Sequence, residues 1–300
     1  MNILSLEHLT HSYTERQLFD DADFYLHEGD KVGAIGINGT GKSTLLKIMA
    51  GLETPDEGQV IQASNLMIHY LPQNPEFSEE DTVLQSVQNM VHHHANENEL
   101  IAAKAMLTRL GITDFEQKTR ELSGGQRKRL ALVSVLITPC DVLILDEPTN
   151  HLDSEMADWL ENKLQAFRGA LVMVTHDRYF LDSVTNKIIE LDKGKIYSYD
   201  EKYSGFLQRK AEREESARAS ERKRQSILRK EIEWISRGAR ARSTKQKAHI
   251  QRYETLKNQK APEVDEKLQL SSISSRMGKT TIEIENVSKA YGENTLIRDF

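Results

Sequence analysis

Short apolar runs alternate with helical patterns over residues 1–203 of this chain. The runs at Lys31–Ile35, 141–145 and Ala170–Val174 are almost wholly apolar, which is typical of strands that a parallel sheet buries on both faces. Helical patterns cover residues 43–50 and 153–167. Gly51 is placed to end the first of these helices. This alternation predicts an α/β fold with a mostly parallel sheet.

Two further stretches depart from that alternation. Residues 74–121 are more polar and are predicted to be largely helical. From about residue 206, Gly and Pro become rare, and apolar residues recur at helical spacing at Leu228, Ile232 and Ile235, then at Ile250, Tyr253 and Leu256. Between the two stripes, Gly238 is predicted to end one helix, and Ser243 with Gln246 forms a capping-box pattern that starts another. The pattern predicts an antiparallel helical hairpin with its tip at 237–247.

The end of the chain resembles its beginning. Residues 282–291 repeat the apolar and polar pattern of residues 4–13. We therefore expect one complete domain at 1–203, a basic hairpin at 204–262, a polar connector at 263–280, and the opening strands of a second copy of the first domain at 281–300. The phosphate loop of that second copy would lie beyond Phe300. Chance similarity between two short amphipathic strands is the alternative.

Charge separates the hairpin from the rest of the chain. The net charge is −6, yet residues 206–260 hold 17 Lys and Arg against 7 Asp and Glu. A basic segment on an acidic body indicates that this segment alone meets a polyanion. The single Cys140 excludes a disulfide framework and cysteine-rich zinc sites. With no signal peptide or long apolar run, the protein is expected to be soluble and cytoplasmic, with no membrane partner.

A phosphate-binding loop is indicated at residues 36–43, which read GINGTGKS and follow a predicted strand. Glycines in such a loop let backbone N–H groups surround phosphate oxygens, and the following helix adds its positive end. Lys42 is predicted to reach the β- and γ-phosphates, and Ser43 to bind Mg²⁺. A glycine-rich loop without a ligand is the alternative.

An acidic pair, Asp146-Glu147, ends another predicted strand. Asp146 is predicted to hold Mg²⁺, and Glu147 to orient or deprotonate the attacking water. Taken alone, such a pair is also compatible with solvated surface. Gln73 is a candidate contact for Mg²⁺ or water, His176 for the γ-phosphate, and Tyr13 for stacking on adenine. Each of these three is weak alone, because isolated residues of these types are usually surface or packing residues.

The sequence LSGGQ at 122–126 opens a predicted helix. Ser123 and Gln126 form a capping box, which is a sufficient structural reason for both. The adjacent Gly124 and Gly125 add bare backbone amides at a positive helix end, which is an anion-binding arrangement. We expect it to meet the γ-phosphate of a nucleotide that another domain binds.

In this order the motifs resemble those of an ATP-binding-cassette domain. The resemblance covers about the first 200 residues and implies a mixed sheet core with a helical subdomain, ATP and Mg²⁺ as cofactors, and ATP hydrolysis. It assigns catalysis to Glu147, His176 and Gln73, Mg²⁺ binding to Ser43, Gln73 and Asp146, and the partner's nucleotide to Ser123, Gly124, Gly125 and Gln126. It assigns ATP binding to Tyr13, Gly36, Asn38, Gly39, Thr40, Gly41, Lys42, Ser43 and Thr44.

Within that family, EPTNHLD at 147–153 and THDRYFL at 175–181 resemble the ABC-F subfamily, whose two cassettes are joined by a basic helical linker. The segment at 238–247 is most similar to the linker of the Uup-type branch. The resemblance implies a translation factor or an antibiotic-resistance ribosome protection protein that acts on the ribosome. Its hairpin would contact ribosomal RNA and peptidyl-tRNA through Arg237, Arg240, Arg242, Lys245 and Lys247, near Trp234.

Alternatives stay open at this point. A basic hairpin binds any polyanion, so a DNA-binding or DNA-maintenance ATPase is the second reading, and the ATPase subunit of a transporter is the third. The triplet His92-His93-His94 is read as a solvated turn rather than a metal site. We expect weak hydrolysis by this chain alone, because the site lacks its partner cassette, unless two copies pair as a homodimer.

Overall fold

A computed structural model describes residues 1–13, 16–90, 97–236, 244–258, 286–291 and 294–298. The chain divides into two compact units, Met1–Ser216 and Ala217–Phe300. The elements in chain order are β1 (Asn2–Tyr13), β2 (Arg16–His27), β3 (Lys31–Ile35), α1 (Lys42–Met49), β4 (Glu57–Gln62), β5 (Ile68–Leu71), α2 (Val83–Met90), α3 (Glu97–Arg109), the 3-10 turn η1 (Thr119–Glu121), α4 (Gly124–Ile137), β6 (Val142–Asp146), α5 (Ser154–Ala166), β7 (Ala170–Val174), α6 (Arg178–Val184), β8 (Lys187–Asp192), β9 (Lys195–Tyr199), α7 (Tyr203–Ser236), α8 (Thr244–Asn258), β10 (Lys289–Tyr291) and β11 (Asn294–Ile297).

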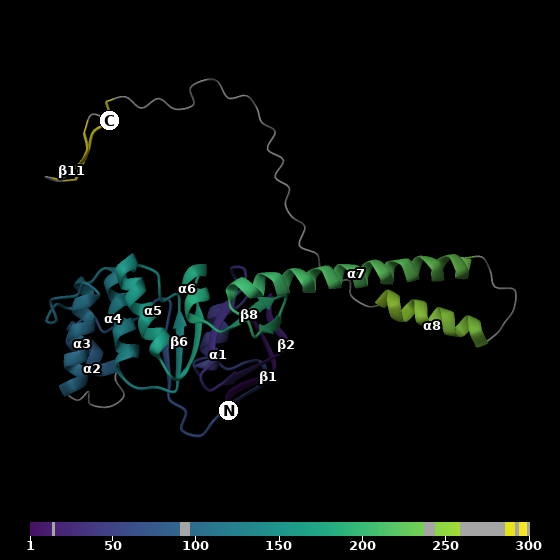
Figure 1. Cartoon of the computed structure of the whole chain (residues 1–300), viewed down its shortest axis with the longest axis horizontal. Coiled ribbons are helices and arrows are strands. Elements are labelled where there is room, and N and C mark those ends of the chain that lie inside the picture. Colours follow the sequence, from purple (N-terminus) through teal and green to yellow (C-terminus); the bar gives the residue numbers. More distant parts are fainter. Residues whose placement is uncertain (14–15, 91–96, 237–243, 259–285, 292–293, 299–300) are drawn as a thin grey trace. The chain divides into compact units, whose positions relative to one another are not determined.

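The first unit is built on two sheets. Within the described residues, one sheet has the order β5-β6-β7-β3-β8-β9, and all of its neighbouring strands are parallel except β8 and β9. The other has the order β2-β1-β4 and is antiparallel. Helices α2 and α3 pack against α4 and form the helical part of the unit (Figure 1). The predicted mixed-sheet α/β fold with a helical subdomain is confirmed.

Two hydrophobic cores lie on the two faces of the larger sheet. Leu143 and Leu145 of β6 belong to one core, and Val142 and Ile144 belong to the other. Successive side chains of a strand point to opposite faces, so a strand covered on both sides must be apolar throughout. The second core also receives the inward side chains of β1, β2 and α1. The wholly apolar runs in the sequence therefore mark the central strands.

The helical predictions differ in detail from the structure. Helix α1 starts one residue earlier than expected, and α5 starts at Ser154 because the Asp153 carboxylate caps it by accepting from the Met156 N–H at 2.9 Å. Residues 74–82 and 110–118 are not in helices, so residues 74–121 are less helical than predicted.

The helix after the cassette begins inside the first compact unit. Helix α7 starts at Tyr203, and the unit that contains its first turns ends at Ser216, not at the expected boundary of 203. Phe206 is 3% exposed, and its ring lies 5.1 Å from that of Tyr199. The base of α7 is therefore part of the packed domain.

The second unit contains the rest of α7 and α8. The Arg224 guanidinium donates to the Leu256 carbonyl at 2.7 Å and pairs with Glu221 on its own helix at 2.7 Å. These contacts bring the end of α8 back beside α7, as a hairpin requires. The tip at 237–243 lies outside the described residues.

The short strands β10 and β11 repeat the end of the β1–β2 pairing. Tyr291 pairs with Asn294 as Tyr13 pairs with Arg16, and Ala290 pairs with Thr295 as Ser12 pairs with Gln17. The next pairs, Lys289 with Ile297 and His11 with Phe19, follow the same register shift. The likeness between the two ends of the chain therefore extends from residue pattern to strand register.

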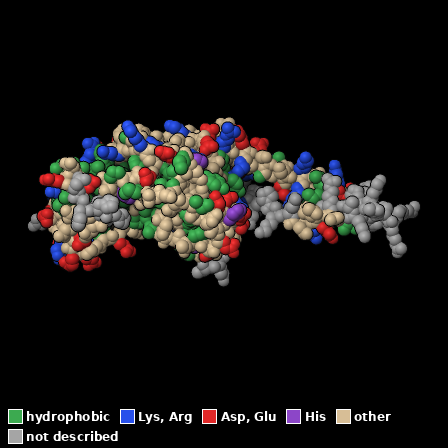
Figure 2. All heavy atoms as spheres, turned by 90° about the horizontal axis from the view of Figure 1, so that it is seen from below, with side chains coloured by type: hydrophobic (Ala, Val, Ile, Leu, Met, Phe, Trp, Pro, Cys, Tyr) green, Lys and Arg blue, Asp and Glu red, His purple; other side chains and the backbone are tan. Residues whose placement is uncertain are grey.

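The surface of the first unit is mixed in charge (Figure 2). The face of the first unit drawn in Figure 2 carries both acidic and basic side chains. In the part of the chain that the structure describes, no helix is both long enough and apolar enough to span a bilayer.

Candidate functional site

Four parallel strands bring the candidate site residues to one edge of the larger sheet. The carboxyl ends of β3, β5, β6 and β7 lead into the phosphate loop, Gln73, Asp146-Glu147 and His176, respectively. Because the carboxyl ends of parallel strands share an edge, residues far apart in sequence meet there. A cavity of about 410 Å³ opens at this point, lined by Tyr13, Leu18, Asn38, Gly39, Gly41, Lys42, Ser43, Thr44, Gln73, Asp146, Glu147, Val174 and His176.

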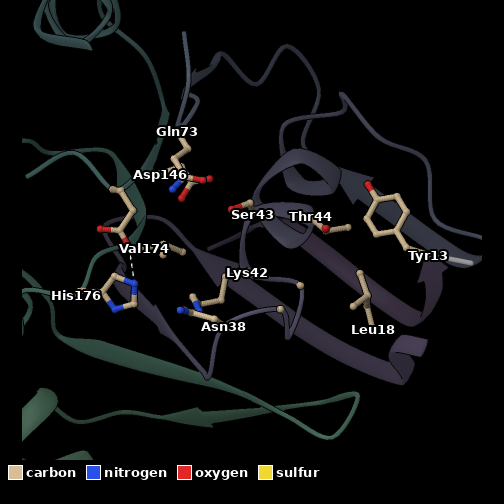
Figure 3. A pocket seen from close by; sticks show the side chains of 13 residues that line it. Tyr13, Leu18, Asn38, Lys42, Ser43, Thr44, Gln73, Asp146, Val174 and His176 are labelled. Carbon is tan, nitrogen blue, oxygen red and sulfur yellow. Dashed lines mark ion pairs between the residues drawn. The ribbon is translucent and has the colours of Figure 1, made fainter. Parts of the chain in front are cut away.

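The cavity has two chemically different ends. Tyr13, Leu18 and Thr44 lie at one end, and Lys42, Asn38 and His176 lie toward the other (Figure 3). The first end offers an aromatic ring and an aliphatic side chain, whereas the second offers cationic and polar groups. This arrangement suits an elongated ligand with an aromatic base and a charged tail.

The phosphate loop has the backbone that its glycines allow. Gly39 has φ 80° and Gly41 has φ 94°, both in the left-handed region. Gly41 is the N-cap of α1, so the positive end of that helix faces the loop. The Lys42 ammonium donates to the carbonyls of Gly36 at 2.8 Å and Ile37 at 3.1 Å. Burial lowers the pKa of Lys42, and the charges of Glu147 and Asp146 oppose that shift.

Two loop residues predicted to bind nucleotide do not line the cavity. A methyl group at Gly36 would lie 2.8 Å from the Leu191 carbonyl oxygen, so this glycine is needed for close packing on β8. The Thr40 hydroxyl donates to the Ile37 carbonyl at 2.9 Å and so stabilises the turn of the loop itself. In this structure both residues shape the loop.

The acidic pair is buried and incompletely satisfied. Asp146 is 1% and Glu147 4% exposed, and burial raises the pKa of each carboxyl group. The Ser43 hydroxyl hydrogen-bonds Asp146, yet Asp146 Oδ2 and Glu147 Oε2 have no hydrogen-bond partner. A buried carboxylate oxygen without a partner is costly unless a cation or water meets it.

These oxygens fit the magnesium prediction. Hydroxyl and carboxylate oxygens from Ser43 and Asp146, with the amide of Gln73, are the hard ligands that Mg²⁺ prefers. No cluster of three or more His, Cys, Asp or Glu that could hold a metal occurs among the residues described. The protein oxygens present therefore suit a cation that is bound jointly with phosphate.

The loop after β6 holds Glu147 in an uncommon backbone conformation, with φ 53°. The Glu147 N–H donates to the Val174 carbonyl at 2.8 Å, and the Thr149 and Thr175 hydroxyls hydrogen-bond at 2.8 Å. These bonds join the end of β6 to the end of β7. As a result, His176 Nε2 lies 3.4 Å from Glu147 Oε1 (Figure 3, dashed line). The segments that follow β6 and β7 thus present Glu147 and His176 to the cavity.

Tyr13 is 48% exposed and is fixed by polar neighbours. Its hydroxyl donates to Glu53, and this bond is the main reason that the pKa of Tyr13 is raised. Glu53 also bonds His11 Nε2 at 3.0 Å, and the His11 ring meets the Tyr13 ring edge-on with centroids 5.2 Å apart. Glu53 and His11 therefore set the orientation of the phenol ring.

Leu18 and Val174 line the cavity although the sequence did not single them out. Both are apolar strand residues, and the pattern alone does not distinguish them from the core. Glu53 likewise resembles any acidic loop residue before its contact with Tyr13 is known. Only the position of Leu18, a few residues after the predicted stacking tyrosine, offered a signal.

The LSGGQ segment lies outside this cavity. The Ser123 hydroxyl accepts from the Gln126 N–H at 3.2 Å, and the Gln126 side chain accepts from the Ser123 N–H at 2.9 Å, so the predicted capping box is present. A methyl group at Gly124 would meet nothing within 4 Å, whereas one at Gly125 would lie 3.2 Å from His151 Cβ. The start of α4 therefore presents an open backbone surface, and the chain's own cavity does not use it.

The predicted RNA contacts are not described structurally. Arg237, Arg240 and Arg242 lie outside the described residues, and Lys245 and Lys247 lie in α8 with side chains that are not described. The triplet at 92–94 also lies outside the described residues.

Comparisons with known proteins agree with this geometry. Two family models described as ABC transporter match residues 19–150 and 189–271. The fold resembles the ATP-binding cassette MJ0796, solved as a dimer in a post-hydrolysis state with ADP and phosphate, at a TM-score of 0.57 and 24% identity. That match covers 66% of this chain and 98% of the other.

Curated relatives align along nearly the whole chain. An uncharacterized ABC transporter ATP-binding protein, YfmR of Bacillus subtilis, is 43% identical, covering 100% of this chain and 54% of the relative. The energy-dependent translational throttle protein EttA of Haemophilus influenzae is 35% identical, covering 95% and 58%. EttA of Escherichia coli is 33% identical, also covering 95% and 58%. The chain thus spans little more than half the length of these relatives.

The first family model spans the phosphate loop, the start of the signature helix and the acidic pair. The chain belongs to the ATP-binding-cassette family of ATPases, and its relatives are those of an ABC-F type protein.

Proposed function

We propose that this chain is the first cassette and interdomain linker of an ABC-F type ATPase that acts on the ribosome. The observation that carries the ATPase part is the cavity, where the phosphate loop, Gln73, Asp146, Glu147 and His176 meet. The second cassette, in this proposal, follows residue 280.

Nucleotide binding uses both ends of the cavity. The adenine ring stacks on Tyr13, and the phosphates enter the loop between Asn38 and Thr44. The Lys42 ammonium turns from the carbonyls of Gly36 and Ile37 to the β- and γ-phosphate oxygens. Mg²⁺, when bound, neutralises phosphate charge next to Ser43, Gln73 and Asp146.

Hydrolysis depends on Glu147 and His176. The unpartnered Glu147 Oε2 accepts a hydrogen bond from the attacking water and directs it at the γ-phosphorus. The exposed His176 imidazole contacts the γ-phosphate from the neighbouring strand end. In the absence of a second cassette the water is only partly enclosed, so turnover is slow.

The base of α7 links the cassette to the basic hairpin. Glu190 of β8 is 3% exposed and pairs with Lys210 at 2.5 Å and Arg213 at 2.9 Å, both from α7. Glu190 also lies beside Ile35, which directly precedes the phosphate loop. Movement of the cassette is therefore carried into the start of the linker helix.

The ribosomal part rests on two supports. Relatives at 33–35% identity are named translational throttle proteins, and residues 206–260 carry a net positive charge. A basic hairpin with closely spaced arginines suits the phosphates and bases of structured RNA. ATP-driven closure of two cassettes positions the hairpin at ribosomal RNA and peptidyl-tRNA, and hydrolysis releases it.

The test uses the full-length protein with Glu147→Gln, which keeps ATP bound. We expect it to pellet with ribosomes in ATP and not in ADP. Adding the charge reversals Arg240→Glu and Arg242→Glu should weaken pelleting about tenfold or more and reduce its salt dependence, because each lost phosphate contact lowers the salt slope by about one.

Matched controls separate the parts of the proposal. Charge reversal of Arg109, a cassette arginine 4.0 Å from Glu155, should leave pelleting unchanged. If ATP had no effect on pelleting, the ribosomal role would be wrong. Tighter binding to branched DNA than to structured RNA across the salt series would favour a DNA-binding ATPase instead.

A further inference from the structure

Two glycines of the phosphate loop lie against strand β2. A methyl group at Gly41 would lie 3.0 Å from Phe19 Cζ and 3.3 Å from Leu18 Cβ. A methyl group at Gly39 would lie 2.9 Å from Arg16 Nη1, 3.5 Å from its Cζ and 3.6 Å from its Nη2. The guanidinium of Arg16 therefore covers the Gly39 backbone edge, as Leu18 and Phe19 cover that of Gly41.

The contacts with Gly39 and Gly41 come from neighbouring residues of one strand. Arg16 and Leu18 of β2 both reach the phosphate loop, Arg16 at Gly39 and Leu18 at Gly41. Leu18 lines the cavity. Arg16 is the pairing partner of Tyr13 across the β1–β2 hairpin. Arg16 therefore lies beside Tyr13 in the strand pairing, and its guanidinium lies against the phosphate loop.

The Arg16 side chain places a positive charge beside the phosphate loop. The side chain is exposed, and the structure shows no ion pair between Arg16 and any carboxylate among the described residues. A guanidinium carries five N–H donors in a planar fork, which matches the oxygens of a phosphate group. An arginine against a phosphate loop supplies positive charge that the loop's sequence motif does not include.

We propose that Arg16 is a nucleotide-contacting residue whose guanidinium binds the phosphate chain from the β2 side of the loop. This inference rests on the proposed ATP site and adds to it a ligand from outside the loop. The residue discriminates phosphorylated nucleotides from the free nucleoside, and it does not read the base.

The test measures binding of adenosine, ADP and ATP to this chain by isothermal titration calorimetry. Arg16→Ala is expected to weaken ADP and ATP binding about tenfold, the usual effect of losing a charged hydrogen bond. Adenosine binding should not change. Arg16→Lys should recover part of the loss, because lysine keeps the charge but not the planar fork.

Gln17→Ala is the matched control, since Gln17 lies next in the same strand and its side chain bonds Asp20 rather than the loop. It should leave all three affinities unchanged. An equal loss of adenosine, ADP and ATP in Arg16→Ala would mean that Arg16 only supports the Tyr13 hairpin, and unchanged affinities would also overturn the proposal. Failure of the unmutated chain to bind ATP would instead refute the proposed nucleotide site itself.

Discussion

At the scale of single residues, two buried carboxylates of the candidate site lower the stability of the folded domain. Asp146 and Glu147 are buried beside each other, and each keeps an oxygen without a hydrogen-bond partner. The pKa of Glu147 is raised mainly by burial, while His176 opposes the shift. The charges that suit a cation and a water molecule therefore destabilise the domain when neither is bound.

Removing one of these charges should stabilise the nucleotide-free chain. Because the folded-state pKa of Glu147 is raised, the folded state binds its proton more tightly than the unfolded state does. Glu147→Gln should therefore increase the free energy of unfolding at pH 7 by about 1 kcal/mol. The gain should shrink as the pH falls through the raised pKa and vanish below about pH 4, where glutamate is protonated in both states.

Urea unfolding across a pH series measures this difference. Glu155→Gln provides the comparison, because the Glu155 side chain is 89% exposed and makes one distant ion pair. Its free energy of unfolding should stay close to that of the unmutated chain at every pH. A Glu147→Gln variant that was less stable at pH 7 than at pH 4, relative to the same reference, would contradict the burial argument.

At the scale of elements, the first turns of α7 are held by a buried carboxylate. Glu190 accepts from Lys210, Arg213 and, at 3.2 Å, the Tyr199 hydroxyl, while Arg213 stacks 3.8 Å above the ring centroid of Tyr197. Charged hydrogen bonds to a buried group are among the stronger polar contacts. The linker helix is thereby joined to the central sheet rather than tethered by a loop.

Loss of the Glu190 charge should loosen that junction. Glu190→Gln leaves two cations facing a neutral amide, and we expect the free energy of unfolding to fall by about 1–3 kcal/mol. Hydrogen exchange should accelerate over residues 203–216 and change little in α4. Glu212→Gln is the control on the same helix, because Glu212 is exposed and its contacts with Arg209 at 3.6 Å and Gln208 at 3.0 Å lie within α7 itself. Equal hydrogen-exchange rates over residues 203–216 in the two variants would contradict the claim that Glu190 holds the base of α7.

At the scale of the whole molecule, the nucleotide cavity and the LSGGQ segment are separate sites on the first unit. Ser123 does not line the cavity, and Gly124 faces open space. Two copies that pair symmetrically would bring each signature to the other's loop. Activity of this chain should then depend on association.

Turnover is therefore expected to rise with the square of protein concentration while the chain is mostly monomeric. A mixing experiment tests the same idea. Lys42→Ala and Ser123→Arg chains should each be inactive alone, yet their mixture should hydrolyse ATP, because one of the two sites in a mixed dimer has an intact loop and an intact signature. Turnover that is linear in concentration, with no activity in the mixture, would show a self-sufficient site.

Local sequence patterns were sufficient to predict several strands and one helix start of this protein. The apolar runs predicted β3, β6 and β7 because burial on both faces leaves no polar positions. The capping box at Ser123 was also predictable, since its hydrogen bonds span only three residues. Helical content over 74–121 was overestimated, because loops there are shaped by packing on α2 and α4 rather than by local propensity.

The sequence by itself determined the fold class, the order of the motifs and the chemical type of each candidate site residue, because these depend on local spacing and composition. Only the tertiary structure decided which residues share the cavity. Leu18, Val174 and Glu53 joined the site through contacts between strands and loops, Gly36 and Thr40 proved to shape the loop, and Arg16 came to lie on Gly39. Such contacts join residues distant in sequence, so their physical cause is the pairing and packing of strands, which no local pattern contains.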